Sequence, residues 1–193
     1  MENIYAARLS ALRKLMQEKG VDYYLIPTAD FHNSEYVHDY FKCRAFMSGF
    51  TGSNGTMVVS DKEACLWTDG RYFIQCEREI EGSGIVMMKI SEPGVPSIAE
   101  YLKNNMKAGE TLGFDGRCVN SSQFLDFQDK LKDITFKMDE DLVNLIWEDR
   151  PDMPATDLFL IPDELAGVSV QGKISQVREK LDGCDSLFLS KLD

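Results

Sequence analysis

Apolar residues recur along this chain at two spacings, one typical of helices and one typical of strands. The first helical pattern covers residues 4–19. Its apolar positions share one face: Leu9, Leu12, Leu15 and Met16. Gly20 follows at once, and glycine is the usual residue where a helix ends in a left-handed conformation. The pattern therefore predicts an opening helix that stops at Gly20.

Strand-like and helix-like runs then alternate as far as residue 138. Strands are predicted at residues 21–27, 56–60, 64–68, 85–90, 111–114 and 134–138. Helices are predicted at residues 71–80, from Pro96-Ser97 onward, and from Asn120 to about Lys132. Ser97 and Glu100 have the spacing of a capping box. Residues 61–63 join two strands as a hairpin, whereas the other connections are long enough for crossovers, so we expect an α/β fold with a mixed β-sheet flanked by helices.

Two segments interrupt this alternation. Residues 30–46 are polar, aromatic and irregular, with room for one helical turn. Residues 49–55 are rich in glycine, but they lack the Lys-Ser/Thr of a phosphate-binding P-loop and the spacing of a dinucleotide fingerprint. Glycine also serves where the backbone must turn with positive φ, so a structural turn is predicted there.

A domain boundary is predicted where Pro151 and Pro154 stiffen the chain. Residues 1–150 would form one domain and residues 151–156 a linker. Residues 157–193 pattern as a strand at 158–161, a helix at 172–181 and a strand at 186–189. Such a βαβ unit cannot bury both of its faces, so we expect the start of a second, similar domain that continues past Asp193.

Composition and charge narrow the class of protein. The chain has 193 residues, of which 44% are hydrophobic and 27% charged, which is typical of a soluble globular protein. Its formal net charge of −11 disfavours nucleic acid and anionic membranes as partners. No apolar run could span a bilayer, and the N-terminus lacks a secretory pattern, so we expect a cytoplasmic protein. The five scattered cysteines fit reduced core thiols.

Residues 30–36 gather an acid, an imidazole, a hydroxyl, a second acid and a phenol directly after a strand. Loops at the carboxyl ends of parallel strands often bind ligands, which would place His32 and Glu35 at a polar site. Alternatively, Asp30 and Ser34 are turn and cap residues and His32 is bonded locally. Candidate metal ligands here are His32, Glu35, His38 and Asp39. They match neither HExxH nor an EF-hand loop, so no metal site is predicted.

Residues 67–73 are the most distinctive stretch of the sequence. Asp69 could cap the helix that follows by accepting its free backbone N–H groups. Arg71 is poorly placed for the dipole of that helix, which indicates an anionic partner, either across an interface or within the chain. No nucleophile elbow, catalytic Cys-His pair or dinucleotide fingerprint occurs. The residues alone therefore predict a fold and two polar loops but no reaction centre.

Several segments together resemble the N-terminal domain of three-domain Xaa-Pro aminopeptidases (aminopeptidase P). They are Asp30-x-His32-x-Ser34-Glu35-Tyr36, Arg44-x-Phe46-x-Ser48-Gly49-Phe50-Thr51-Gly52-Ser53-x-Gly55-Thr56, Leu66-Trp67-Thr68-Asp69-Gly70-Arg71-Tyr72-Phe73, Pro93-Gly94-Val95-Pro96, and Leu142-Val143-x-x-Ile146-Trp147-x-Asp149-Arg150-Pro151. Val177-Arg178-x-Lys180-Leu181 and Ser190-Lys191-Leu192-Asp193 resemble the family's second domain. Phe31, Asn33 and Asn54 occupy variable positions or depart slightly from the commonest pattern.

The resemblance implies two creatinase-like N-terminal domains of ribonuclease H-like fold, followed by a pita-bread catalytic domain. In this family the last domain binds two divalent metals, usually manganese, through two Asp, one His and two Glu. A bridging water or hydroxide then attacks the bond ahead of a proline in second position. The region that would match those ligands lies beyond Asp193, so the resemblance implies no catalytic residue, no metal ligand and no activity for this chain alone.

For the intact enzyme, the resemblance implies a cytoplasmic homodimer that acts on proline-containing peptides, with this region contributing to dimerisation and active-site access. The residues expected to touch substrate or a partner subunit are His32, Tyr36, Arg44, Asp69 and Arg71. One alternative is a peptide- or protein-binding module of a pita-bread pseudo-enzyme, as in a histone-binding chaperone. Another is a creatinase or a two-domain Xaa-Pro dipeptidase, which has only one domain ahead of the catalytic one.

Overall fold

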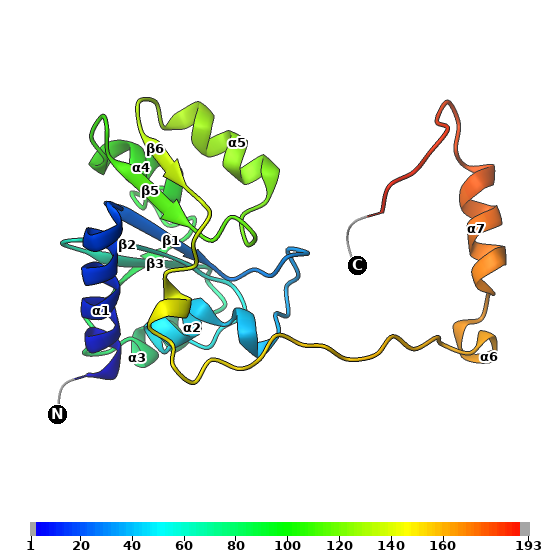
Figure 1. Ribbon diagram of the computed structural model, residues 1–193, viewed down its shortest axis with the longest axis horizontal. Coiled ribbons are helices and arrows are strands. Elements are labelled where there is room, and N and C mark those ends of the chain that lie inside the picture. Colours follow the sequence, from blue (N-terminus) through cyan, green and yellow to red (C-terminus); the bar gives the residue numbers. More distant parts are fainter. Residues whose placement is uncertain (1–2, 190–193) are drawn as a thin grey trace. The chain divides into compact units, whose positions relative to one another are not determined.

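The computed structural model describes residues 3–189 and divides the chain into two compact units, one up to Asp152 and one from Met153 (Figure 1). The first unit contains a six-stranded sheet within the described residues, in the order β4-β3-β2-β1-β5-β6. Its strands are β1 (Tyr23–Pro27), β2 (Thr56–Ser60), β3 (Ala64–Thr68), β4 (Val86–Lys89), β5 (Thr111–Phe114) and β6 (Thr135–Lys137).

The sheet is mixed, as predicted. β2 runs antiparallel to both β1 and β3, while β1 with β5, β5 with β6 and β3 with β4 are parallel. Pro27 pairs with Thr56, and Thr56 with Trp67. The carboxyl ends of β1 and β3 and the start of β2 therefore lie at the same end of the strands, on one side of the sheet's length.

Helices cover both faces of this sheet because alternate strand side chains point to opposite sides. Tyr24, Ile26, Met57 and Val59 belong to a core cluster with α1 (Ile4–Lys19), α2 (Cys43–Ser48) and α3 (Phe73–Glu79). Leu25, Val58, Cys65 and Trp67 belong to a second cluster with α4 (Ile98–Asn105) and α5 (Ser121–Lys130). Figure 1 shows the resulting three layers.

The predicted helix ends are confirmed where the local sequence specifies a cap. Gly20 closes α1 with φ +63°, in the left-handed region. Ser97 and Glu100 form both bonds of the capping box at the start of α4. The Asn120 side chain accepts a hydrogen bond from the Gln123 N–H at the start of α5. Two short 3₁₀ turns complete the first unit, η1 (Asp39–Phe41) and η2 (Val143–Leu145).

One predicted cap is wrong. α3 begins at Phe73 rather than Arg71, its N-cap residue is Tyr72, and that cap makes no side-chain hydrogen bond. The Asp69 carboxylate instead accepts the Arg71 N–H, two residues on. Short polar side chains favour such local turns as readily as helix caps, so spacing alone did not separate the two.

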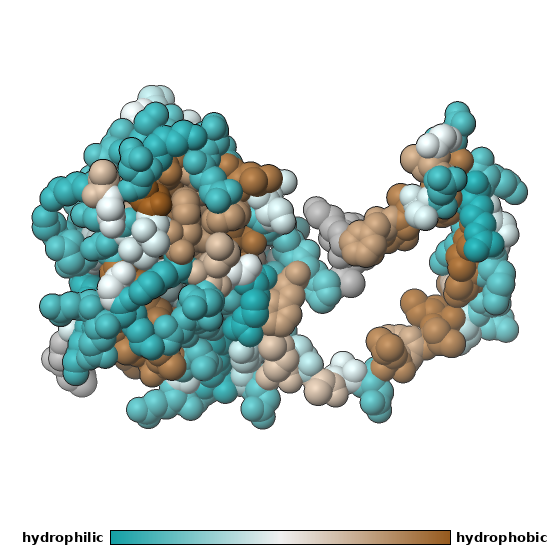
Figure 2. All heavy atoms as spheres, turned by 45° about the horizontal axis from the view of Figure 1, so that its top comes forward, coloured by the Kyte–Doolittle hydropathy of each residue, from teal (hydrophilic) through white to brown (hydrophobic). Residues whose placement is uncertain are grey.

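The second unit contains α6 (Asp163–Ala166) and α7 (Val170–Glu179), and α7 overlaps the helix predicted at 172–181. The strands predicted at 158–161 and 186–189 are wrong for the part of the chain described here, because neither segment is paired. A strand needs a neighbour for its backbone N–H and C=O groups, and apolar composition does not provide one. Leu158, Phe159 and Leu160 are exposed, and Figure 2 shows hydrophobic side chains on the surface of this unit.

The Ser190–Asp193 part of the resemblance lies outside the described residues. The domain limits of 1–150 and 157–193 stay predictions. Within residues 3–189, no helix has the length and apolar character needed to cross a membrane.

Candidate functional site

Three segments meet at the end of the sheet where β1 and β3 finish. The first follows β1 and covers residues 28–42, here called the pocket loop. The second is the glycine-rich segment, residues 49–55, and the third is the turn of Asp69 to Tyr72. The first two, together with Arg44 and Ala45 of α2, line a cavity of about 330 Å³. Its lining residues are Thr28, Glu35, Tyr36, Val37, Phe41, Lys42, Arg44, Ala45, Thr51, Gly52 and Ser53.

Arg44 lines this cavity as a buried side chain and is not an exposed binding group. Its residue is only 4% exposed, and burial lowers the pKa of its guanidinium to about 10. Nη1 donates to the Phe50 carbonyl oxygen at 2.5 Å, Nη2 donates to the Gly52 carbonyl, and Nε donates to Thr28 Oγ1 at 2.9 Å. The guanidinium also lies over the Phe50 ring. Arg44 therefore ties the glycine-rich segment to the end of β1.

Asp69 and Arg71 form an ion pair within one turn. Arg71 Nε donates to Asp69 Oδ1 at 3.0 Å and Nη2 donates to Oδ2 at 2.8 Å. Asn54 Nδ2 donates to the same Oδ2 at 2.6 Å, which joins the turn to the glycine-rich segment. Hydrogen bonds from Arg71 and then Asn54 lower the pKa of Asp69. Of the two partners that the sequence allowed for Arg71, the structure shows the one within the chain.

The His32–Tyr36 stretch is displayed on the outside of the pocket loop. Asp30 Oδ1 accepts the N–H groups of His32 and Ser34, each at 2.9 Å, so Asp30 is the turn residue of the second sequence interpretation. Burial opposes the ionised form of Asp30, but these two bonds outweigh it and lower its pKa. Tyr36 is 82% exposed and lines the cavity together with Glu35. His32 is exposed but is not a lining residue.

The four candidate metal ligands do not assemble. His38 Nδ1 accepts the Tyr40 N–H at 3.2 Å, and Asp39 pairs with Lys42. Among the side chains in residues 3–189, no group of three or more His, Cys, Asp and Glu is arranged to hold a metal ion.

Sequence reasoning missed a polar cluster beside the cavity. Glu79 accepts the Thr51 N–H at 2.8 Å and the Thr51 hydroxyl at 2.9 Å, and Gln75 Nε2 donates to Thr51 Oγ1 at 2.9 Å. Gln75 and Glu79 lie one turn apart on α3, which is a visible helical spacing. Their partner Thr51 lies 28 positions from Glu79, so no local pattern indicated the contact.

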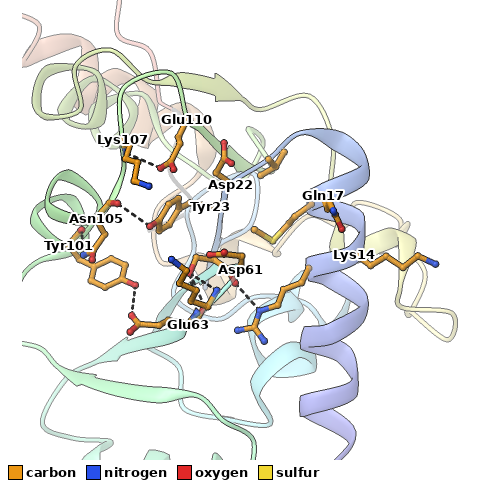
Figure 3. Close-up of a pocket in the computed structure, with 15 residues that line it drawn as sticks. Lys14, Gln17, Asp22, Tyr23, Asp61, Glu63, Tyr101, Asn105, Lys107 and Glu110 are labelled. Atoms are coloured by element: carbon orange, nitrogen blue, oxygen red, sulfur yellow. Dashed lines mark hydrogen bonds between the residues drawn. The ribbon is translucent and has the colours of Figure 1, made fainter.

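A larger cavity of about 730 Å³ lies at the opposite end of the strands, where β1 begins (Figure 3). Tyr23 and Tyr101 line it, together with positively charged lysine and arginine side chains and negatively charged carboxylates. Two of its carboxylates accept hydrogen bonds from the protein itself: Glu63 accepts the Tyr101 hydroxyl at 3.0 Å, and Glu110 accepts the Lys107 N–H at 2.9 Å. Because the lining carries both positive and negative side chains, its charge favours neither anionic nor cationic ligands.

Comparison with known proteins supports a family assignment. The model of the Creatinase/Prolidase N-terminal domain family matches residues 8–148. Aminopeptidase P2 of Arabidopsis thaliana is 36% identical over 199 residues, covering 96% of this chain and 27% of that protein. The chain thus spans little more than a quarter of that relative's length.

Solved structures show the same relationship. The X-prolyl aminopeptidase of Caenorhabditis elegans, a cytosolic enzyme with a di-nuclear active site, is 31% identical with a TM-score of 0.83, over 92% of this chain and 31% of that one. The Xaa-Pro dipeptidase of Bacillus anthracis shares the fold, with 22% identity and a TM-score of 0.55 over 74% of this chain and 35% of that one. Because the family model accounts for most of the first unit, this chain belongs to the Creatinase/Prolidase N-terminal domain family.

Proposed function

We propose that this chain is the non-catalytic N-terminal region of a metal-dependent Xaa-Pro aminopeptidase, an enzyme that removes the residue ahead of proline. The observation that carries the proposal is the extent of the likeness to the nematode X-prolyl aminopeptidase, which covers 92% of the chain. Residues up to Asp152 are too few to supply that share, so the likeness continues into the second unit. The likeness to the dipeptidase covers 74%, which the first unit alone can supply.

The described residues do not provide a metal site for such an enzyme, because no three or more of their His, Cys, Asp and Glu side chains lie together as ligands. The proposed catalytic domain would hold two divalent ions, with manganese as the expected metal, outside these 193 residues.

The role that we propose for this region is dimerisation and control of access to the active site. Two features support it: the pocket loop presents Tyr36 with 82% of its surface exposed, and the Asp69–Arg71 pair follows β3 at the same end of the sheet. His32, Tyr36, Asp69 and Arg71 are the residues proposed to face peptide or a partner subunit. Arg44 would act indirectly, by shaping the cavity wall. A cytoplasmic location is proposed by analogy with the cytosolic nematode enzyme.

The test is hydrolysis of a short Xaa-Pro peptide with added Mn²⁺, with the matching Xaa-Ala peptide as the specificity control. It is run on this 193-residue chain and on a version extended along its gene to the stop codon. Cleavage of the proline peptide by the extended version only, abolished by a chelator, is the expected result. Cleavage by the 193-residue chain would contradict the proposal, and no cleavage by either would favour the peptide- or protein-binding module.

A further inference from the structure

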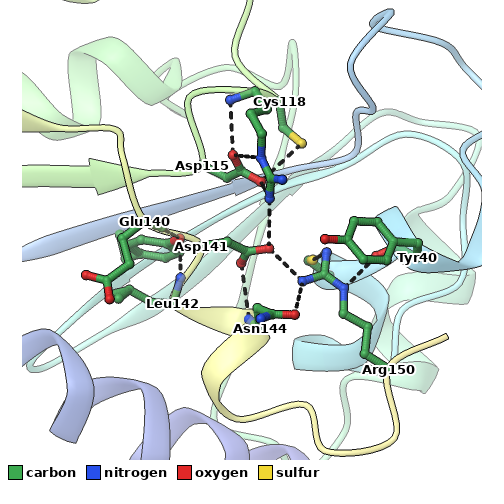
Figure 4. A network of polar contacts seen from close by, with 11 residues as sticks. Tyr40, Asp115, Cys118, Glu140, Asp141, Leu142, Asn144 and Arg150 are labelled. Carbon is green, nitrogen blue, oxygen red and sulfur yellow. Dashed lines mark hydrogen bonds and ion pairs between the residues drawn. The ribbon is translucent and has the colours of Figure 1, made fainter. Parts of the chain in front are cut away.

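A buried carboxylate, that of Asp141, lies between two arginines behind the pocket loop (Figure 4). Arg150 Nη1 is 2.6 Å from Asp141 Oδ2, and Arg117 Nη2 is 3.8 Å from the same oxygen. The side chains of Arg150 and Asp141 are only 6% and 8% exposed. A guanidinium this well buried depends on its carboxylate, because few water molecules can replace that partner.

Arg150 holds the end of the pocket loop. Its Nε donates to the Tyr40 carbonyl oxygen at 2.9 Å, and its guanidinium lies 3.9 Å from the centre of the Tyr40 ring. Nη2 approaches Cys43 Sγ at 3.2 Å, just beyond the loop. Nη1 also donates to Asn144 Oδ1 at 3.1 Å. Every nitrogen of this planar group therefore has a fixed partner, which a lysine could not reproduce.

Arg117 holds the start of the same loop. It lies on the turn after β5 and is fixed there by two bonds to Asp115, of 2.9 and 3.0 Å. Its guanidinium lies over the Phe31 ring, 5.1 Å from the ring centre. Phe31 in turn packs edge-on against Phe41, with 4.8 Å between ring centres. Residues 32–36, of which all but Ser34 are exposed, lie between these two points of attachment.

We propose that Asp141 is a positioning residue, which holds the pocket loop by orienting Arg150 at its end and by adding a longer ion pair to Arg117, already bound to Asp115, at its start. This inference rests on the aminopeptidase function proposed above. In that enzyme, Asp141 fixes the positions of Glu35 and Tyr36 relative to an incoming peptide. Asp141 touches no substrate. It acts through the two arginines, as a supporting residue behind a binding site does.

Hydrogen–deuterium exchange of the 193-residue chain tests the structural part. The relevant amides are hydrogen-bonded in the loop: those of His32, Asn33 and Ser34 at its start and Tyr40, Phe41 and Lys42 at its end. In Asp141→Asn, which keeps the size of the side chain, exchange of both groups should rise by roughly tenfold or more, while amides of β2 and β3 keep their protection. The matched control is Asp126→Asn, which removes an exposed ion pair to Lys130 on α5 and should leave the loop unchanged.

Unchanged loop exchange in a folded Asp141→Asn protein would overturn the proposal. An equal rise in β2 and β3 would also overturn it, because that result means general destabilisation. If Asp141→Asn does not fold, Arg117→Lys gives the answer, since Arg117 is half exposed and its loss is milder. Exchange should then rise more at residues 32–34 than at residues 40–42, and an even rise or none would contradict the two-point attachment.

Kinetics of the extended protein test the functional part. Asp141→Asn should raise KM for a proline peptide several-fold and leave kcat within about twofold, because the loop borders access but supplies no reacting group. A loss of kcat at unchanged KM would overturn the access role. If the extended wild-type protein has no peptidase activity, the proposed function fails, whereas the exchange result still decides the role of Asp141.

Discussion

The guanidinium of Arg44 lies against the backbone of the glycine-rich segment, with Nη1 2.5 Å from the carbonyl oxygen of Phe50. Replacing Arg44 by Met keeps much of the apolar stem but leaves the Phe50 and Gly52 carbonyls without their buried donor. Each unsatisfied buried group costs about 1–3 kcal/mol, so Arg44→Met should lower the free energy of unfolding by about 3 kcal/mol. Urea denaturation of the 193-residue chain measures this.

Arg78→Met is the control for that measurement, because Arg78 is an exposed arginine on α3. It should change the free energy of unfolding by no more than about 0.5 kcal/mol. Equal effects of the two substitutions would show that the bonds of Arg44 do not support the fold.

The burial of Arg44 also shows why the candidate site was only partly predictable. Arginine is among the residue types most often exposed, so sequence reasoning places it on the surface. Its partners, Thr28, Phe50 and Gly52, come from two loops that only the assembled sheet brings together. The Asp69–Arg71 pair, by contrast, is local, and the sequence already indicated an anionic partner for Arg71.

The fold was predictable wherever a residue fixes its own neighbourhood. Gly20 ends α1 because glycine tolerates positive φ, and the Ser97–Glu100 capping box starts α4 with contacts confined to one turn. Segment 158–161 failed for the opposite reason. Its four apolar residues fit a buried strand, but strand formation depends on pairing partners that a local pattern cannot reveal.

The Asp69–Arg71 pair gives a prediction about pH. Because Arg71 and Asn54 donate to the carboxylate, the folded-state pKa of Asp69 lies below the ordinary value of 3.8. The pair therefore contributes stability above about pH 4, and this contribution is lost as the pH falls through the lowered pKa. Carboxyl ¹³C NMR should find Asp69 still ionised at a pH where ordinary aspartates are half protonated.

Arg71→Gln should move the Asp69 midpoint up toward 3.8, while Arg78→Gln should leave it in place. High salt should weaken the effect in the wild-type protein, because the Arg71 side chain is 60% exposed. An Asp69 midpoint at or above the ordinary value would contradict the ion pair.

Gly52 has no room for a side chain. A Cβ there would stand 2.3 Å from the Phe50 ring and 2.8 Å from Tyr72, and Phe50 is fully buried. Gly52→Ala should therefore destabilise the fold by about 1–3 kcal/mol through overpacking. Gly70→Ala is the matched control, since its Cβ would come no closer than 3.8 Å to Phe73. Thermal unfolding that ranks the two substitutions equally would argue against the packing described here.

The five cysteines should differ sharply in their reaction with iodoacetamide at pH 8, because the thiolate is the reacting form. Burial raises the pKa of Cys43 to about 12 and that of Cys76 to about 11, whereas Cys184 is exposed. Mass spectrometry should therefore find Cys184 alkylated first in the folded chain, and all five alkylated at similar rates in urea. Cys43 also packs against Arg150, so Asp141→Asn should speed its alkylation relative to Cys76. Rapid labelling of Cys43 in the wild-type chain would show that the contacts behind the pocket loop open readily.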